Sequence, residues 1–208
     1  MYRNIIWDLD GTIFDTYPAM ARAFKAALNE LGADAPLDWL EDQARISFGT
    51  CSLSLATKFS LPEPDILRVY REQYYRIPLS EQPIFEGVVD ICELMLARGG
   101  LNLIVTHRGD GSAHRLLDAS NISHYFTDRI TQDAGFPKKP DPSAFHAMID
   151  KHNLVQAETL AVGDRDLDVQ AGQAAGLFSC LFTNRTSAVS PDLTFNDYGI
   201  LEDFLKAN

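Results

Sequence analysis

Two aspartates directly follow the first apolar run of the chain and could take part in covalent chemistry. The run Ile5–Trp7 leads into the stretch Asp8–Thr12, which reads DLDGT. A carboxylate is ionised at neutral pH and can attack an electrophile, so Asp8 is a candidate nucleophile. Gly11 lets the chain turn, so that the carboxylate of Asp10 can reach the same space. Because two close acids raise one pKa, Asp10 could donate a proton to a leaving group; the alternative is a surface turn.

Two later segments carry polar side chains that suit the binding of an anion. Thr106 lies near the end of an apolar run, where its hydroxyl and adjacent backbone N–H groups could hold an oxyanion. His107 and Arg108 follow it, and residues of these types are more often on a surface than in a site. Lys139 directly precedes Pro140 and could hold its ammonium group against a phosphoryl oxygen. The alternative for the lysine is a solvated basic turn.

The segment GDRDLD carries three further acids. Asp164 and Asp168 are four residues apart and would share one face at the start of a helix, while Asp166 would point elsewhere. Clustered carboxylates repel one another, and a divalent cation would relieve that repulsion. Magnesium binds a few carboxylates, keeps several waters and accepts a substrate phosphate. The alternative is capping of a helix N-terminus by acids, which is the role that we expect for Asp166.

The elements that would position these residues alternate between strands and helices. Strands are expected over residues 4–10, 101–107, 128–132, 159–164 and 178–184, and helices over residues 88–98, 111–120, 144–151, 166–175 and 200–205. Asp141 is expected to cap a helix that has Pro142 at its first position and then runs through residues 144–151. This alternation predicts an α/β fold with a parallel sheet and helices on both faces. Ligands of such sheets bind at the carboxyl ends of the strands, where the polar residues fall.

A stretch without convincing strands interrupts the alternation directly after the first strand. Amphipathic helical patterns run through residues 18–31, 39–44, 52–59 and 65–77. We therefore predict a core domain of residues 1–15 and 83–208, and an inserted all-helical cap of residues 16–82. Arg45 and Thr50, in and beside the segment FGTCS, are candidates for contacts that select the substrate. The alternative is that Thr50 or Ser52 caps a helix start.

Composition narrows the classes of partner. The 208 residues include 29 acidic and 18 basic side chains, for a net charge of −11. Such a chain repels nucleic acid and anionic membranes, so we expect neither as a partner. Three separated cysteines fit no disulfide or zinc pattern, so we expect reduced, buried thiols in a cytoplasmic protein. Separately, we expect the protein to be a monomer or a homodimer. No apolar run is long enough to span a membrane.

In their order along the chain, these motifs resemble the haloacid dehalogenase superfamily. The resemblance is carried by DLDGTIFD, by Thr106 at a strand end, by KPDPSAF and by VGDRDLDVQAGQAAG. The helical insert is similar to that of the subclass with a small helical cap, and of its phosphoglycolate-phosphatase-like members. The resemblance implies a Rossmann-like core and a magnesium-dependent phosphatase. Its substrate would be a small phosphorylated metabolite, and phosphoglycolate, a sugar phosphate and a nucleotide are all open.

The resemblance also implies how the reaction would proceed. Asp8 would be the nucleophile and form an aspartyl-phosphate, and Asp10 would be the general acid and base. Thr106 and Lys139 would bind the transferring phosphoryl group. His107 stands where Asn or Gly is usual in the family, and its backbone N–H would still contribute to that binding.

A metal site is implied in the same way. Asp8, the main-chain carbonyl of Asp10, and Asp164 would ligate Mg²⁺. Asp168 would contact the metal-binding groups without binding the ion itself, or would hold a water ligand.

Other activities of the superfamily, and a non-catalytic phosphoryl-ligand-binding module, remain open. Dehalogenation needs neither magnesium nor a second acid, so the presence of both Asp10 and Asp164 argues against it. A phosphomutase similar to beta-phosphoglucomutase would use a histidine in the cap, and every histidine lies outside residues 16–82. A phosphonate hydrolase needs a cap lysine; only Lys25 and Lys58 are available, and neither stands out.

Overall fold

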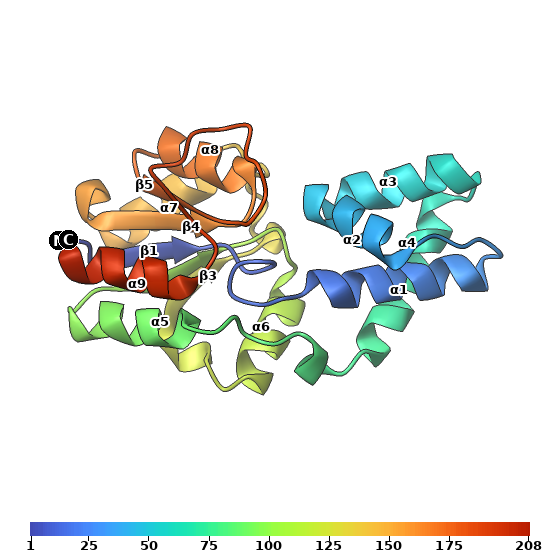
Figure 1. The fold of residues 1–208 in the computed structure, drawn as a ribbon, viewed down its shortest axis with the longest axis horizontal. Coiled ribbons are helices and arrows are strands. Elements are labelled where there is room, and N and C mark those ends of the chain that lie inside the picture. Colours follow the sequence, from blue (N-terminus) through green and yellow to red (C-terminus); the bar gives the residue numbers. More distant parts are fainter. The chain divides into compact units, whose positions relative to one another are not determined.

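The computed structural model describes all 208 residues, and the chain divides into two compact units. The sheet unit comprises Met1–Phe14 and Ile84–Asn208, and the helical unit comprises Asp15–Pro83. Figure 1 shows strands and helices in the first and only helices in the second. The role of the helical unit as a cap remains a prediction.

Six parallel strands form a single sheet, which confirms the predicted α/β fold class. The strands are β1 Asn4–Trp7, β2 Asn102–Val105, β3 Phe126–Ile130, β4 Thr159–Gly163, β5 Phe178–Phe182 and β6 Leu193–Phe195. Their order is β3-β2-β1-β4-β5-β6, so β1 lies between β2 and β4. All residues of β1, β2 and β4 are buried, as expected for strands covered on both faces. The strand order reverses at β1, and its carboxyl end is therefore where a ligand is expected.

Helices cover the two faces of the sheet (Figure 1). They are α5 Val88–Ala97, α6 Asp110–Ala119, α7 Ser143–His152, α8 Asp166–Ala174 and α9 Tyr198–Ala207. Apolar side chains of α7 and α8 pack on β1, β2 and β4, with Phe145 and Met148 in contact with the cluster around Ile6. On the other face, α5 and α9 contact each other. Short 3-10 helices lie at Leu79–Glu81, Ser123–Tyr125, Gln132–Ala134 and Gln156–Glu158.

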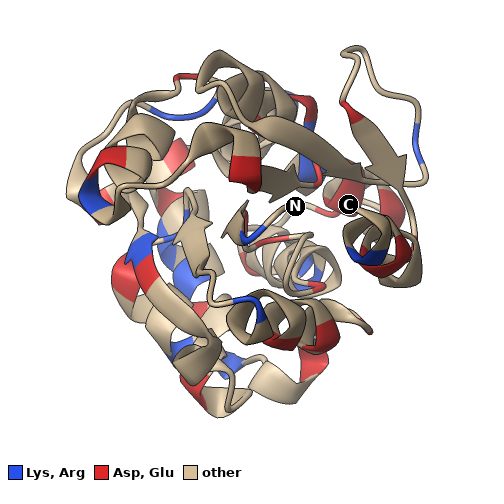
Figure 2. Cartoon of the chain, turned by 90° about the vertical axis from the view of Figure 1, so that its left-hand side faces the viewer, with Lys and Arg blue, Asp and Glu red and all other residues tan.

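The two ends of the chain lie side by side in the sheet unit (Figures 1 and 2). Arg98 connects them, because its guanidinium donates to the carbonyl of Tyr2 at 2.8 Å and to that of Leu205 at 2.7 Å. Figure 2 also shows Lys and Arg interspersed with Asp and Glu along the ribbon.

The helical unit has a core of its own. Its helices are α1 Tyr17–Glu30, α2 Leu37–Ile46, α3 Phe48–Phe59 and α4 Glu63–Arg76. Phe24, Leu40, Leu55 and Ile66 are completely buried and bring the four helices together. This packing follows from the apolar stripe that each helix carries at a 3.6-residue period.

Several expected boundaries were wrong. The strand β6 was missed, because a run of three residues carries too little pattern to be recognised. Pro142 rather than Asp141 is the N-cap of α7, and the Asp141 carboxylate instead accepts the N–H of Ser143 at 2.9 Å.

The three cysteines are free and buried, as expected. None of the helices combines the length and the apolar character needed to cross a membrane.

Candidate active site

The DLDGT stretch continues β1 and then turns sharply. The N–H of Asp8 donates to the carbonyl of Val162 at 2.8 Å, which extends the pairing of β1 with β4 by one residue. Gly11 has a φ of +79°, a conformation that favours glycine, and its N–H donates to Phe14. The N–H groups of Ile13 and Phe14 donate to the carbonyl of Leu9. The turn therefore leaves Asp8 fixed at the carboxyl end of the central strand.

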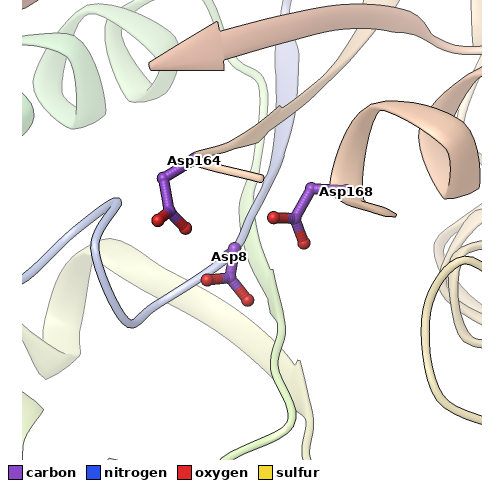
Figure 3. Close-up of side chains that lie close together, drawn as sticks. All are labelled: Asp8, Asp164 and Asp168. Atoms are coloured by element: carbon purple, nitrogen blue, oxygen red, sulfur yellow. The ribbon is translucent and has the colours of Figure 1, made fainter. Parts of the chain in front are cut away.

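Asp8, Asp164 and Asp168 form a cluster at this end of the sheet (Figure 3). One carboxylate oxygen of each lies within 4.8 Å of the others. Asp164 follows β4 in a turn, and α8 begins only at Asp166, so the expectation that Asp164 and Asp168 share a helix face was wrong. They meet because the first turn of α8 packs against Gly163. A Cβ at residue 163 would collide with the side chain of Asp168.

Lys139 neutralises this cluster in part. Its Nζ lies 2.5 Å from Asp8 Oδ1 and 2.5 Å from Asp168 Oδ1, and donates to the carbonyl of Val105 at 3.0 Å. The three charged side chains are at most 4% exposed. Burial raises the pKa of Asp8 to about 6, and the attraction of Lys139 opposes that rise. Burial acts on Asp168 as well, but Lys139 and Arg165 outweigh it and lower the pKa of Asp168.

The cluster suits a divalent cation. Asp8 Oδ2 is buried and has no hydrogen-bond partner, although an unsatisfied carboxylate oxygen is costly in a protein interior. Three carboxylates and one lysine leave an excess of negative charge within the cluster. Oxygen ligands of this kind and number are those that Mg²⁺ prefers. The donor set therefore fits Mg²⁺, which Asp8 and its neighbours could hold.

Thr106 and His107 directly follow β2, and their side chains make different contacts. Thr106 is 3% exposed, and its Oγ1 accepts the N–H of Arg108 at 3.1 Å, which leaves its hydroxyl hydrogen for another acceptor. The Nε2 of His107 accepts the N–H of Lys139 at 2.8 Å. Burial, together with the charge of Lys139, lowers the pKa of His107 to about 4, so the ring is neutral at pH 7. The side chain of His107 therefore fixes the backbone of Lys139, and phosphate binding by its own N–H remains a prediction.

The structure pairs Asp10 with Arg108, a residue that the sequence analysis treated as a surface side chain. The Nε of Arg108 lies 3.1 Å from both carboxylate oxygens of Asp10, and its Nη2 lies 2.5 Å from Oδ1. The side chain of Arg108 is 6% exposed, and its Nη1 donates to Ser112 at 2.7 Å. A signal was available, because the two residues lie three positions beyond the ends of the neighbouring strands β1 and β2.

Replacement of Arg108 by glutamine should lower the free energy of unfolding by about 3 kcal/mol, because it removes one partner of a largely buried ion pair. Urea unfolding followed by circular dichroism measures this change. Arg129→Gln is the matched control: it breaks the exposed pair with Asp110, where the side chains are 33% and 52% exposed, and should cost less than about 1 kcal/mol. If the two substitutions lowered the free energy of unfolding equally, the pair of Arg108 with Asp10 would stabilise the fold no more than an exposed pair does.

Two further residues near the cluster were not singled out by the sequence analysis. The hydroxyl of Thr12 donates to Asp164 Oδ1 at 3.4 Å. The N–H of Arg165 donates to Asp168 Oδ2 at 3.1 Å, and its Nε lies 3.8 Å from Asp164 Oδ1. The expectation that Asp166 acts as a helix cap was wrong: the N-cap of α8 is Arg165, and the carboxylate of Asp166 accepts from Ser187 at 2.7 Å and from the N–H of Ala188 at 3.0 Å.

Comparison with known proteins shows the family. Residues 5–182 match the family described as haloacid dehalogenase-like hydrolase. The chain belongs to this family. The hydrolase is 30% identical to the phosphoglycolate phosphatase of Photobacterium profundum, in an alignment 217 positions long that covers 97% of this chain and 95% of that protein. It is 31% identical to that of Nitrosospira multiformis over 186 residues, with 84% and 80% covered.

Solved structures agree on the fold. A predicted phosphoglycolate phosphatase from Haemophilus somnus superposes on this hydrolase with a TM-score of 0.85. The alignment covers 98% of each chain at 23% identity, which supports the fold alone. The expected enzyme class, a phosphoric monoester hydrolase of this family, is confirmed by the family match and by the phosphatases among the relatives.

In the helical unit of the hydrolase, Arg45 and Thr50 are engaged locally. Arg45 pairs with Glu41 at 2.8 Å, and its guanidinium lies 4.4 Å from the ring centre of Tyr17. Ser47, not Thr50 or Ser52, is the N-cap of α3, and its Oγ accepts the N–H of Thr50 at 2.9 Å. Roles of Arg45 and Thr50 in substrate recognition remain predictions.

Proposed function

We propose that this hydrolase is a magnesium-dependent phosphatase that acts on a small phosphate monoester. The observation that carries the proposal is the buried group of Asp8, Asp168 and Lys139 beside Asp164, in which Asp8 Oδ2 has no hydrogen-bond partner. A nucleophile, a fixed ammonium group and a set of cation ligands meet at the carboxyl end of β1. The names of the relatives favour phosphoglycolate as the substrate, and a sugar phosphate is the alternative.

In this proposal, Asp8, Asp164 and the main-chain carbonyl of Asp10 hold Mg²⁺, and Asp168 supports the site together with Lys139. When bound, the cation neutralises phosphoryl charge and aligns the phosphorus atom with the nucleophile. Burial raises the pKa of Asp8, and the attraction of Lys139 opposes that rise and favours the ionised form that attacks phosphorus.

The reaction then takes two steps. Asp8 attacks phosphorus, the bond to the ester oxygen breaks, and Asp10 gives its proton to the departing alcohol. Asp10 next takes a proton from water, which attacks the aspartyl-phosphate and releases inorganic phosphate. Arg108 holds the carboxylate of Asp10 through its Nε and Nη2, and so keeps Asp10 in place for both steps. Lys139, Thr106 and the N–H of His107 bind the phosphoryl oxygens.

Two secondary assignments complete the proposal. The helical unit acts as the cap, and its side chains, Arg45 and Thr50 among them, recognise the organic part of the substrate. The enzyme works in the cytoplasm as a monomer or homodimer. A phosphomutase would use a histidine of the cap, and all five histidines lie in the sheet unit, at positions 107, 114, 124, 146 and 152.

Turnover of p-nitrophenyl phosphate with and without magnesium tests the proposal. We expect release of p-nitrophenol with MgCl₂, loss of at least about 90% of the rate in excess EDTA, and recovery after Mg²⁺ is restored. A panel of phosphoglycolate, sugar phosphates and nucleoside monophosphates then ranks substrates by kcat/KM. Absence of phosphate release from every ester would favour the non-catalytic binding module. Isomerised sugar phosphate without phosphate release would favour the phosphomutase.

A further inference from the structure

We propose that Tyr198, in the C-terminal helix α9, is a positioning residue for the DLDGT stretch and for the cation site that Asp164 completes. The inference rests on the proposed function. Tyr198 lies outside residues 5–182, the part of the chain that matches the family. It therefore adds to the motif residues a contact that belongs to the C-terminal part of this chain.

A hydrogen bond joins α9 to the catalytic stretch. The hydroxyl of Tyr198 donates to the main-chain carbonyl of Thr12 at 2.6 Å. Thr12 is completely buried and Tyr198 is 2% exposed, so water does not compete for this carbonyl. The hydroxyl of Thr12 in turn donates to Asp164 Oδ1 at 3.4 Å. A line of contacts thus runs from Tyr198 through Thr12 to a proposed cation ligand.

The hydroxyl of Tyr198 remains a donor over the working pH range. Burial raises the pKa of Tyr198 well above its usual value, and the negative charges of Asp164 and Asp8 raise it further. The phenol therefore stays protonated at neutral pH. The Thr12 carbonyl keeps its hydrogen bond throughout the catalytic range.

Aromatic packing fixes the ring that carries this hydroxyl. The ring centre of Tyr198 lies 4.6 Å from that of Phe182, 5.2 Å from that of Phe195 and 6.2 Å from that of Trp7. Trp7 directly precedes Asp8 and donates its indole N–H to Asn102 at 3.1 Å. Tyr198 therefore contacts the chain on both sides of the nucleophile, through Trp7 before it and through Thr12 after it.

The start of α9 is held equally closely. Gly87 approaches Tyr198 so tightly that a Cβ on the glycine would lie 2.7 Å from the Cβ of Tyr198. Asp197 caps the helix by accepting the N–H of Gly199 at 2.7 Å. The position of the hydroxyl is thus set by the packing of the backbone and the ring. Removal of the hydroxyl alone should leave that packing in place.

Tyr198→Phe removes the hydroxyl and leaves the Thr12 carbonyl buried without this partner. Small displacements at a catalytic group have large effects on rate, so we expect kcat to fall about tenfold. The dissociation constant for Mg²⁺, measured by isothermal titration calorimetry without substrate, should rise about fivefold, because Asp164 is less well oriented. KM at saturating Mg²⁺ should change less than about twofold.

Tyr125→Phe is the matched control. It removes a hydroxyl that donates at 2.7 Å to the carboxylate of Glu93 on the outer surface of the sheet unit. We expect this variant to bind Mg²⁺ and turn over substrate as the wild type does. If Tyr198→Phe loses only stability towards urea and keeps the wild-type kcat and Mg²⁺ affinity, Tyr198 is merely structural and the proposal is overturned.

A double-mutant cycle tests the route through Thr12. Thr12→Val removes the hydroxyl that contacts Asp164 but keeps the carbonyl that Tyr198 binds. If both residues act through Asp164, the double variant should weaken Mg²⁺ binding by less than the product of the two single effects. Independent, multiplicative effects would overturn the route. The calorimetric result does not depend on turnover, so it decides this inference even if the wild type binds Mg²⁺ but hydrolyses no ester.

Discussion

Asp8→Asn should reduce turnover of p-nitrophenyl phosphate by about a thousandfold or more while the protein stays folded. The amide has the shape of the carboxylate but cannot attack phosphorus. The fold should survive, because Lys139 keeps its ion pair with Asp168 at 2.5 Å and its hydrogen bond to Val105. Circular dichroism and steady-state kinetics measure the two effects separately.

The covalent step gives a more direct readout. Wild-type protein quenched in acid during turnover should carry one phosphoryl group on the peptide that contains Asp8, as mass spectrometry would show. Asp90→Asn, which alters an exposed acid in the first turn of α5, should behave as the wild type does in both assays. A phosphoryl group found on another side chain, or wild-type turnover by Asp8→Asn, would exclude Asp8 as the nucleophile.

Lys139→Met should lower kcat by about a hundredfold or more, the scale expected when a fixed charge that stabilises the transition state is removed. The methionine fills a similar volume but leaves Asp8 and Asp168 buried without their shared cation. Lys139 lowers the pKa of Asp8, so its removal should raise that pKa above about 6. The acid limb of the pH–rate profile should therefore move to higher pH, because Asp8 must be ionised to attack.

The adjacent lysine provides the control. Lys138 is exposed, and Lys138→Met should leave the rate and the pH profile unchanged. A large loss of activity in Lys138→Met, with little change in Lys139→Met, would mean that the wrong lysine had been assigned to the phosphoryl group.

The fold class could be predicted because its elements carry strong periodic patterns. The buried runs of β1, β2 and β4 and the apolar stripes of the helices were visible in the sequence. The three-residue strand β6 carries no such pattern. Its place at the edge of the sheet is set by pairing with β5, which only the folded chain reveals.

The site was predictable only in part. The spacing of Asp8, Asp164 and Asp168 relative to the strands indicated that they would meet, and the structure brings them together. The pairing of Asp10 with Arg108 was missed although both residues lie shortly beyond strand ends, because the identity of an arginine does not tell whether it points to solvent or to a neighbouring strand. The contact between Tyr198 and Thr12 joins residues 186 positions apart, and no local pattern predicts it.

The place of β1 in the sheet has a consequence for biosynthesis. Ile5 pairs with Asn102 on one side and with Leu160 on the other, so the strand that leads to Asp8, the proposed nucleophile, is made long before either neighbour. The contacts within residues 15–83 join residues that are closer in sequence than the pairs formed by β1. We therefore expect this helical segment to fold on the ribosome while β1 is still unpaired. A nascent chain that has not yet emerged as far as β4 lacks Asp164 and Asp168, so we expect it to leave cellular esters untouched until that part of the chain has emerged.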